Sequence, residues 1–375
     1  MGAATASALP PFLVGALAVQ LRGDLGFDAA GLGLAISAYW LSSALCSAVL
    51  GRVAEHLGAR RSLRIGLCAN VAVQLSIAAV ARTWGALVVV LLVGGVVNAL
   101  IQLAVNVLLA QEMPPRRLGL ALGAKQSAIP MGTLLAGLAV PLLALTVGWR
   151  WAFVAGAALG LGALAVLPEV HRAPVPTADR PRIGDRPLLP LVVLAGAGAL
   201  GAAAAGALAA FLVSGGVEAG IAEGPAGLLL TSGSACGIAV RLFAGMRADR
   251  RQGGHLRVVA LMLGGGGVAF LAFATGLAGA YVMATPLAFG AGWAWPGLFN
   301  LAVVRDNPDT PGAATGVTQT GIYIGALAGP LVFGAIVDRA AYGPAWVATA
   351  ACSLLAAGAM LAGQHLLHRR NPAAP

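Results

Sequence analysis

The sequence predicts an all-α integral membrane protein with twelve transmembrane helices arranged as two pseudo-symmetric six-helix bundles. Hydrophobic residues make up 59% of the 375 residues and charged residues only 10%, with a mean hydropathy of +0.88. A soluble domain normally carries about a quarter charged residues, so this composition excludes a water-exposed globular protein. The second observation is a repeat, because the phrase that begins at Gly51 returns 194 positions later at Gly245.

The repeated phrase joins a glycine, an acidic residue four positions on, a second glycine and a group of arginines. It reads Gly51-Arg-Val-Ala-Glu55-His-Leu-Gly58-Ala-Arg60-Arg61 in one copy and Gly245-Met-Arg-Ala-Asp249-Arg250-Arg-Gln-Gly253 in the other. Other pairs keep nearly the same offset: Asn106 and Asn300, Gln126 and Gln319, Gly132 and Gly325, Trp151 and Trp346. A duplicated half with a charged hairpin inside an apolar chain is typical of a secondary transporter.

Twelve apolar stretches are long enough to cross about 30 Å of hydrocarbon. Each is expected to be a helix, because a chain in lipid must satisfy its backbone hydrogen bonds within the segment. The expected spans are 3–21, 29–51, 63–81, 85–109, 119–145, 150–168, 189–213, 226–246, 257–275, 279–303, 314–337 and 344–366. We therefore expect an N-terminal bundle over residues 1–168 and a C-terminal bundle over 189–375, joined by a Pro- and Arg-rich cytoplasmic linker at 169–188.

The basic residues set the expected orientation. With twelve spans, 19 of the 23 lysines and arginines fall on the side that holds both termini and the linker, and the other side has only Arg22, Arg82, Arg150 and Arg339. By the positive-inside rule we expect a multi-pass protein of the cell (cytoplasmic) membrane with both termini cytoplasmic. This topology explains the net charge of +10, so nucleic acid is not an expected partner.

Catalytic and metal sites are not expected. The four cysteines stand alone in apolar stretches without the paired spacing of a zinc site: Cys46, Cys68, Cys236 and Cys352. The five histidines form no cluster. No nucleophile and base share one membrane depth. We predict no enzyme activity, no cofactor and no metal, and we expect a monomer whose partners are a small-molecule solute and the lipid bilayer.

The segment from Gly51 to Leu63 resembles the loop signature of the major facilitator superfamily, and the segment from Gly245 to Gly253 resembles its echo in the second half. Gly148-Trp-Arg-Trp-Ala-Phe153 and Gly329-Pro330 through Asp338 are also similar to this family. One departure is that Glu55 and His56 replace the usual aspartate and basic residue of the first signature. The resemblance covers essentially the whole chain and implies the twelve-helix fold.

The resemblance also implies a gating latch that holds the cytoplasmic side shut while the outside is open. The candidate latch residues are Gly51, Glu55, Gly58, Arg60, Arg61, Arg241, Gly245, Asp249 and Arg250. Gly51 and Gly245 are expected to end their helices where a neighbouring helix passes close. Arg241, Gly245 and Asp249 share one helix face at i, i+4 and i+8. In the alternative interpretation the arginines only set topology.

Polar and aromatic residues within the spans are candidate solute contacts, because polar groups near mid-membrane are costly. The set is Tyr39, Trp40, Asn98, Gln102, Asn106, Lys125, Gln126, Trp293, Trp295, Asn300, Gln319 and Tyr323. In the family's fold the first, second, fourth and fifth spans of each half line a central cavity, and most of the set falls on those spans. The alternative is interhelical hydrogen bonding, worth about 0.6–2 kcal/mol per bond. Lys125, the sole lysine, either snorkels to the interface or attracts an anionic solute.

The carboxylates are placed away from mid-membrane. Five are expected at the outer ends of the spans, and the remaining acids fall in cytoplasmic loops: Asp24, Asp28, Glu218, Glu223 and Asp338 are the outer five. This argues against a proton-coupled exporter of cationic drugs and favours neutral or anionic cargo. We predict a secondary active transporter that moves a small organic solute, anionic or amphipathic, by rocker-switch alternating access, with a proton or another ion as coupling partner. The alternatives are a drug or metabolite efflux antiporter and a non-transporting membrane sensor of the same fold.

Overall fold

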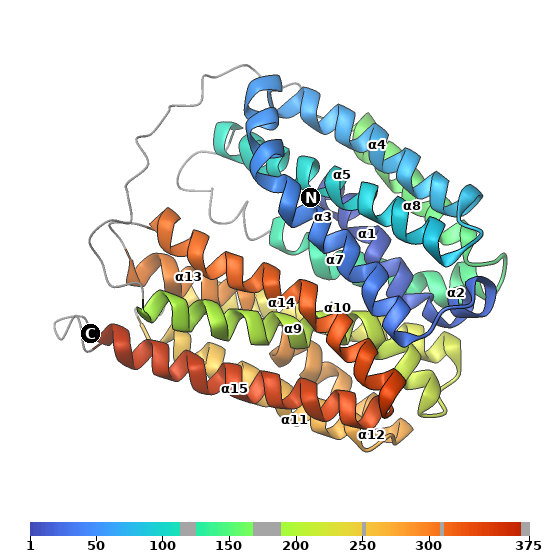
Figure 1. Cartoon of the computed structure of the whole chain (residues 1–375). Helices are drawn as coiled ribbons and strands as arrows, with labels where there is room; N and C mark the ends of the chain where they lie inside the picture. Colours follow the sequence, from blue (N-terminus) through green and yellow to red (C-terminus); the bar gives the residue numbers. More distant parts are fainter. Residues whose placement is uncertain (113–124, 168–188, 250–252, 308–310, 369–375) are drawn as a thin grey trace. The chain divides into compact units, whose positions relative to one another are not determined.

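The computed structural model describes residues 1–112, 125–167, 189–249, 253–307 and 311–368, and all regular structure within these ranges is helical (Figure 1). The predicted linker at 169–188 lies outside the described residues. In the first half the helices are α1 (Gly2–Ala16), α2 (Ala18–Leu25), α3 (Ala29–Leu57), α4 (Ala59–Val80), α5 (Trp84–Glu112), α7 (Ala128–Ala139), the π-helix η1 (Val140–Ala144) and α8 (Arg150–Ala165). In the second half they are α9 (Leu189–Glu218), α10 (Glu223–Asp249), α11 (His255–Ala274), α12 (Ala278–Leu287), the π-helix η2 (Ala288–Trp293), α13 (Pro296–Asp306), α14 (Pro311–Arg339) and α15 (Tyr342–His368).

Nine helical segments of the described chain are long and apolar enough to cross a membrane. The helices α1 and α2 supply a tenth when taken as one span bent by 71°, and Ala128–Ala144 and Arg150–Ala165 are two shorter apolar segments. These segments follow the order of the twelve predicted spans. The prediction of an all-α membrane fold is therefore confirmed.

Short polar and glycine signals mark where helices end. The Asp28 carboxylate accepts a 2.7 Å hydrogen bond from the Gly31 amide and so caps the start of α3. Gly58 separates α3 from α4 by a single residue with φ of +81°, a conformation that a side chain with a Cβ disfavours. The second glycine of the first repeated phrase is therefore the residue at which the chain reverses.

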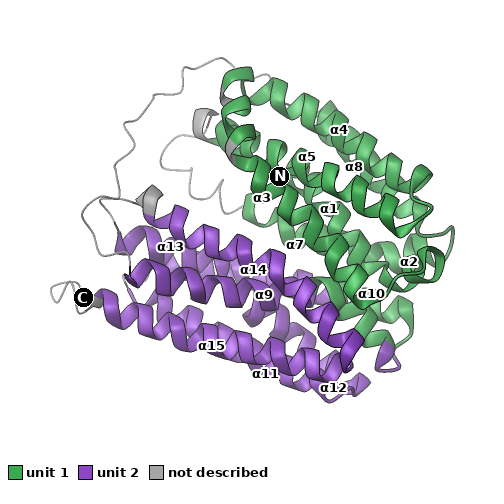
Figure 2. Cartoon of the chain, viewed as in Figure 1, with its two compact units in different colours: residues 1–177, 209–217, 221–231 green, residues 178–208, 218–220, 232–375 purple. Residues whose placement is uncertain are grey.

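The chain divides into two compact units (Figure 2). Unit 1 comprises residues 1–177, 209–217 and 221–231, and unit 2 comprises residues 178–208, 218–220 and 232–375. Unit 1 thus includes the end of α9 and the start of α10 in addition to the first eight helical segments.

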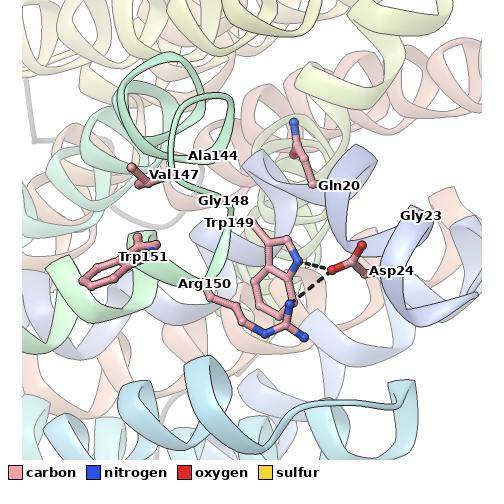
Figure 3. A pocket seen from close by; sticks show the side chains of 9 residues that line it. All are labelled: Gln20, Gly23, Asp24, Ala144, Val147, Gly148, Trp149, Arg150 and Trp151. Atoms are coloured by element: carbon pink, nitrogen blue, oxygen red, sulfur yellow. Dashed lines mark hydrogen bonds and ion pairs between the residues drawn. The ribbon is translucent and has the colours of Figure 1, made fainter.

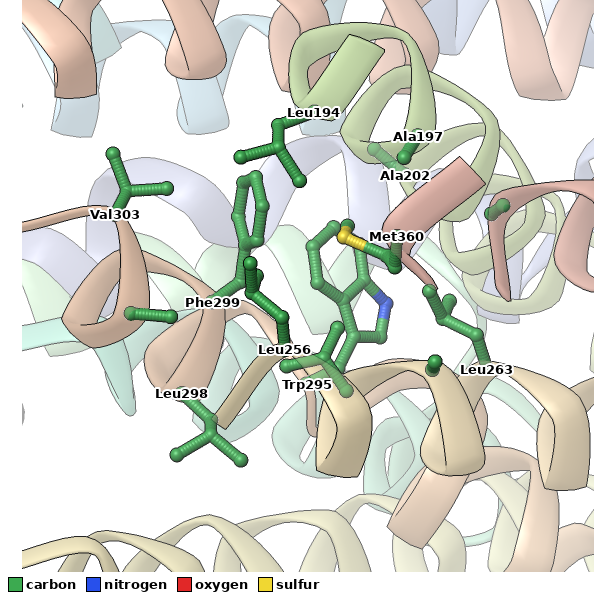
Figure 4. Close-up of a cluster of buried hydrophobic side chains, with 14 of the residues drawn as sticks. Leu194, Ala197, Ala202, Leu256, Leu263, Trp295, Leu298, Phe299, Val303 and Met360 are labelled. Atoms are coloured by element: carbon green, nitrogen blue, oxygen red, sulfur yellow. The ribbon is translucent and has the colours of Figure 1, made fainter. Parts of the chain in front are cut away.

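Unit 2 has a core of large side chains from α9, α11, α13 and α15 (Figure 4). Trp295 and Phe299 are fully buried, and their ring centroids lie 5.6 Å apart. The ring of Trp295 packs on Gly201 of α9, where an added Cβ would lie 2.8 Å from the indole. A glycine at 201 therefore makes room for the largest side chain of this core.

Helices α9 and α14 approach each other through a row of glycines in unit 2. Gly321, Gly325 and Gly329 lie one above the other on α14, and a Cβ at any of them would overlap the backbone of α9. The opposing atoms are the carbonyls of Ala195, Ala199 and Ala203. Small residues at a spacing of four allow this close packing in lipid, where association depends on van der Waals contact.

Candidate solute-binding and gating sites

Two adjacent prolines explain a buried polar network in unit 1. Pro10 and Pro11 lie inside α1 and have no N–H, so the carbonyls of Ala6 and Ser7, four residues earlier, lose their helical donors. Other helices supply the replacements. The Asn70 amide of α4 donates to the Ala6 carbonyl at 3.3 Å, and the Tyr39 hydroxyl of α3 donates to the Ser7 carbonyl.

Asn98 and Gln102 of α5 extend this network. The Ser7 hydroxyl donates to Asn98 Oδ1 at 3.0 Å, and Asn98 Nδ2 donates to the Ser43 hydroxyl at 3.1 Å. Gln102 Nε2 donates to the Ala4 carbonyl at 3.3 Å and lies 3.4 Å from Asn98 Oδ1. Asn98 is buried and Gln102 half-buried. These bonds account for the two amides through interhelical pairing, the alternative interpretation of the sequence.

The remaining first-half candidates have varied surroundings. Trp40 is half-buried between Phe12, at a ring distance of 6.2 Å, and Tyr39, at 5.2 Å. Asn106 is exposed near the end of α5. Lys125 and Gln126 are half-buried just before α7. The structure therefore brings Tyr39, Asn98 and Gln102 together around α1.

The second-half candidates divide between two elements of unit 2. Trp293 and Trp295 are buried at the end of η2 and in the turn that follows it, and Asn300 is half-buried on α13. Two buried polar atoms on this span have no hydrogen-bond partner in the described part of the chain: Trp295 Nε1 and Asn300 Oδ1. Gln319 and Tyr323 lie one turn apart on α14 and interact through their side chains.

Arg241 lies against the same broken span. Its Nη2 donates a 2.6 Å hydrogen bond to the backbone carbonyl of Trp293, and its guanidinium carbon stands 5.9 Å from the centroid of the Trp293 ring. The sequence predicts Arg241 as a latch residue on the helix face that also carries Gly245 and Asp249. The structure places its charged head on a neighbouring span within unit 2.

The helices do not end at the first glycines of the two repeated phrases, so that expectation is wrong. Helix α3 continues past Gly51 to Leu57, and α10 continues past Gly245 to Asp249. An added Cβ at Gly51 would first meet Leu103 at 3.9 Å, and at Gly245 it would meet no described atom within 4 Å. Good helix formers such as Arg52, Ala54, Met246 and Arg247 follow the two glycines, and nothing described at either position stops the helical hydrogen bonding.

The other latch candidates are only partly described. Arg60 is half-buried and Arg61 exposed in the first turn of α4. Arg250 and the side chains of Glu55 and Asp249 lie outside the described part of the structure. Arg305, which the sequence did not single out, binds the end of α10: its Nη1 donates to the Ala248 carbonyl at 3.1 Å. A basic residue in the last turn of α13 was the available signal.

A polar cluster lies at the start of α8 in unit 1 (Figure 3). The Asp24 carboxylate accepts a 2.8 Å hydrogen bond from the Trp149 indole and forms a 3.2 Å ion pair with Arg150. The hydrogen bond from Trp149 and the adjacent Arg150 guanidinium hold the pKa of Asp24 below its usual value. With Gln20 these residues line an open hollow of about 530 Å³.

A glycine contact joins α7 and α10 near this cluster, within unit 1. A Cβ on Gly137 would lie 2.6 Å from the Gly227 carbonyl, and a Cβ on Gly227 would lie 2.7 Å from the Gly137 carbonyl. The Thr231 hydroxyl donates to the Leu134 carbonyl at 3.3 Å across the same contact, and Gln20 hydrogen-bonds Glu223 nearby. Sequence reasoning did not identify Gly137 and Gly227 as partners.

One buried amide in unit 1 lacks a partner. Both side-chain amide atoms of Gln74, on α4, are buried without a hydrogen bond in the described chain. The amide occupies the space over Gly156 of α8, where a Cβ would overlap it. An amide within the third span was the available signal for this position.

Comparison with known proteins gives the family. The family model of the Major Facilitator Superfamily matches residues 2–330. The fold is similar to a D-xylose–proton symporter (TM-score 0.72, 16% identity, 96% of this chain and 95% of that chain) and to the nucleoside transporter NupG (0.73, 16%, 96% and 98%). It is also similar to a bacterial homologue of the human lysosomal transporter Spinster in an inward-facing, unoccupied conformation (0.76, 14%, 98% and 96%). No curated protein sequence matches the chain. The match over residues 2–330, together with the helical fold, shows that this chain belongs to the major facilitator superfamily.

Proposed function

We propose that this protein is a secondary active transporter that moves a small organic solute across the cytoplasmic membrane by rocker-switch alternating access. The observation that carries the proposal is a family match from residue 2 to residue 330, which includes both copies of the repeated phrase. Two of the structures named above are a D-xylose–proton symporter and a nucleoside transporter, so the fold is compatible with several kinds of solute. The position of charge in unit 2, with Arg241 inside a span and acids at helix ends, favours an anionic solute.

The glycine contact between α7 and α10 is the proposed outer gate. Alternating access requires a contact that closes in one state and opens in the other. Backbone-to-backbone packing at Gly137 and Gly227 closes tightly, yet holds few side chains that must be rearranged when it separates. The expected cytoplasmic position of both termini places this contact on the outer side of the membrane.

Solute counterflow in proteoliposomes tests the function. Purified protein is reconstituted into vesicles loaded with one unlabelled solute from a panel of sugars, nucleosides, amino acids and carboxylic acids, and entry of the labelled solute is followed. Saturable entry that requires internal solute supports a transporter. Absence of entry across the panel, with correctly inserted protein, would favour a membrane sensor of the same fold.

A matched pair of variants tests the gate. Gly137→Leu would force α7 and α10 apart and should reduce counterflow strongly. Gly162→Leu, on α8, meets no described atom within 4 Å and serves as the control. Equal counterflow in both variants would contradict the gate. An imposed pH gradient of either direction in the same vesicles separates proton symport from the alternative of an efflux antiporter.

A further inference from the structure

The guanidinium of Arg241 lies near the middle of a membrane span in unit 2. Its hydrogen-bond acceptor, Trp293, is the sixteenth residue of the 29-residue segment Ala278–Asp306. Helical side chains tilt toward the N-terminus of their own helix, so from α10 the head of Arg241 points away from the helix end at Asp249. An arginine that snorkelled to the near interface would extend in the other direction. Arg241 therefore holds its charge within the membrane.

A break in the facing span creates the acceptor. The π-helix η2 ends at Trp293, the chain turns through Ala294 and Trp295, and α13 begins at Pro296. Irregular backbone at membrane depth is tolerated where its polar groups find partners. Arg241 is such a partner for Trp293.

Close packing fixes the position of Arg241. The turn of α10 that precedes it packs on η2: a Cβ on Gly237 would lie 3.3 Å from the Phe289 carbonyl, and a Cβ on Gly290 would lie 3.2 Å from Val240 Cγ2. A side chain held between two tightly packed elements loses little further freedom when it binds a ligand. The head of Arg241 is therefore preorganised.

The chemistry of this arrangement suits a carboxylate with an apolar body. A backbone carbonyl is neutral, so it orients the guanidinium and leaves the positive charge in place. A guanidinium binds a carboxylate through paired N–H donors, and more strongly where water is scarce. The ring of Trp293, centred 5.9 Å from the guanidinium carbon, is a flat apolar group beside it.

The repeat shows that the fold does not require this pair. At the 194-residue offset, Ser47 takes the place of Arg241 and Ala99 the place of Trp293. The Ser47 hydroxyl donates to the Ala44 carbonyl of its own helix. The glycine and acidic residue of the phrase recur in both halves, whereas the charge inside the span occurs once. This difference is expected of a ligand contact in one half.

We infer that Arg241, held by the Trp293 carbonyl, recognises the carboxylate of a small aromatic or aliphatic acid, and that Trp293 contacts its apolar body. The inference rests on the proposed function and names the class of solute and the residue that reads its charge. It changes the role of Arg241 from cytoplasmic latch to solute recognition.

Equilibrium binding to the full chain in lipid nanodiscs tests the inference without requiring transport. Labelled benzoate is the probe, with hexanoate and acetate as competing acids and benzamide as the neutral analogue of the same shape. The wild type should bind benzoate saturably, and hexanoate should compete whereas benzamide should not. Arg241→Gln should weaken benzoate binding by roughly 30-fold or more, the loss expected when one partner of a buried charge pair is removed. Trp293→Leu should weaken benzoate more than acetate.

The matched control is Arg247→Gln, which removes the same charge from an exposed position six residues further along α10 and should leave binding unchanged. Arg241→Lys keeps the charge without the planar fork and should bind roughly tenfold more weakly than the wild type. It decides the question if Arg241→Gln does not elute as a folded monodisperse protein. Three results would each overturn the inference: no saturable benzoate or hexanoate binding by the wild type, equal competition by benzamide, or unchanged affinity in the Arg241 variants. Benzoate binding without counterflow would contradict the transport function alone, and counterflow of neutral solutes without acid binding would contradict the anion site alone.

Discussion

The Tyr39 hydroxyl donates to the Ser7 carbonyl, which Pro11 leaves without a helical donor. Tyr39 is fully buried, and α3 thereby supplies the donor that a carbonyl of α1 lacks. A residue selected from the sequence as a solute contact thus has a structural task. This relationship can be tested directly, because the defect and its repair lie on different helices.

Tyr39→Phe should lower stability, since it leaves a buried carbonyl unsatisfied. The expected loss is about 1–2 kcal/mol, between the cost of an orphaned acceptor and the value of hydrogen bonds in membranes. Thermal unfolding in detergent measures it, with Tyr323→Phe on α14 as the control because that side chain is 52% exposed. The double variant Pro11→Ala/Tyr39→Phe should recover most of the loss, because an N–H at position 11 again reaches the Ser7 carbonyl. Additive losses in the double variant would refute this relationship.

Gly325→Ala should destabilise unit 2, because the new Cβ would overlap the Ala199 carbonyl of α9 and a backbone cannot move aside. Overpacking of this kind costs about 1–3 kcal/mol, and Gly325→Leu should reduce the amount of folded protein further. Gly316→Ala, on the same helix with no described atom within 4 Å, is the control. Size-exclusion profiles and unfolding temperatures of the three variants give the comparison. Equal stability of Gly325→Ala and Gly316→Ala would contradict the close α9–α14 packing.

Asp24 should make a small contribution to stability that depends on pH. The Trp149 hydrogen bond, with Arg150 beside it, depresses the pKa of Asp24 in the folded state, so the contribution is present above the unfolded pKa of about 3.9 and is lost as the pH falls through the lower folded pKa. The ion pair is partly exposed, so about 0.2–1 kcal/mol is expected at neutral pH. Unfolding temperatures of the wild type and Asp24→Asn should therefore differ at pH 7 and converge in strong acid. A difference that persists at the lowest pH would argue against this assignment.

Gln74→Leu should stabilise unit 1. A buried amide without partners costs free energy, and leucine has a similar volume in the space over Gly156. An increase of about 1 kcal/mol is expected from removing both unsatisfied groups. A loss of stability would show that the amide has a partner, such as a bound water, that the replacement removes.

Asp249→Asn tests the latch in the second repeated phrase. If the carboxylate closes the cytoplasmic side, its neutral form should reduce counterflow severalfold while leaving the amount of membrane-inserted protein nearly unchanged. Arg305→Gln, which removes the contact to the Ala248 carbonyl next to Asp249, should lower stability in addition. Unchanged turnover in Asp249→Asn would remove the latch role.

The family and the helical membrane fold could be predicted from the sequence because their signals are repeated along the chain. Each apolar span, each copy of the phrase around Gly51 and Gly245, and the segregation of basic residues point to the same architecture. The exact helix ends were harder to predict. Gly51 was predicted to end its helix, but the chain reverses at Gly58. Gly58 has φ of +81°, a conformation that favours glycine, whereas Gly51 lies within α3.

The candidate site residues could likewise be predicted only in part from the sequence. The sequence alone determined which polar residues lie within the apolar spans, since their depth follows from counting along a helix. It could not decide what each one meets, because partners come from helices remote in the chain: Asn70 and Tyr39 serve carbonyls exposed by two prolines of α1, and Gly227 meets Gly137. Only the tertiary structure showed that the Arg241 guanidinium binds the Trp293 carbonyl, because the backbone at the break between η2 and α13 gains this donor only once the spans are packed side by side. Hydrophobic burial along one helix is a local property of the sequence, whereas hydrogen bonding between helices is a property of their packing.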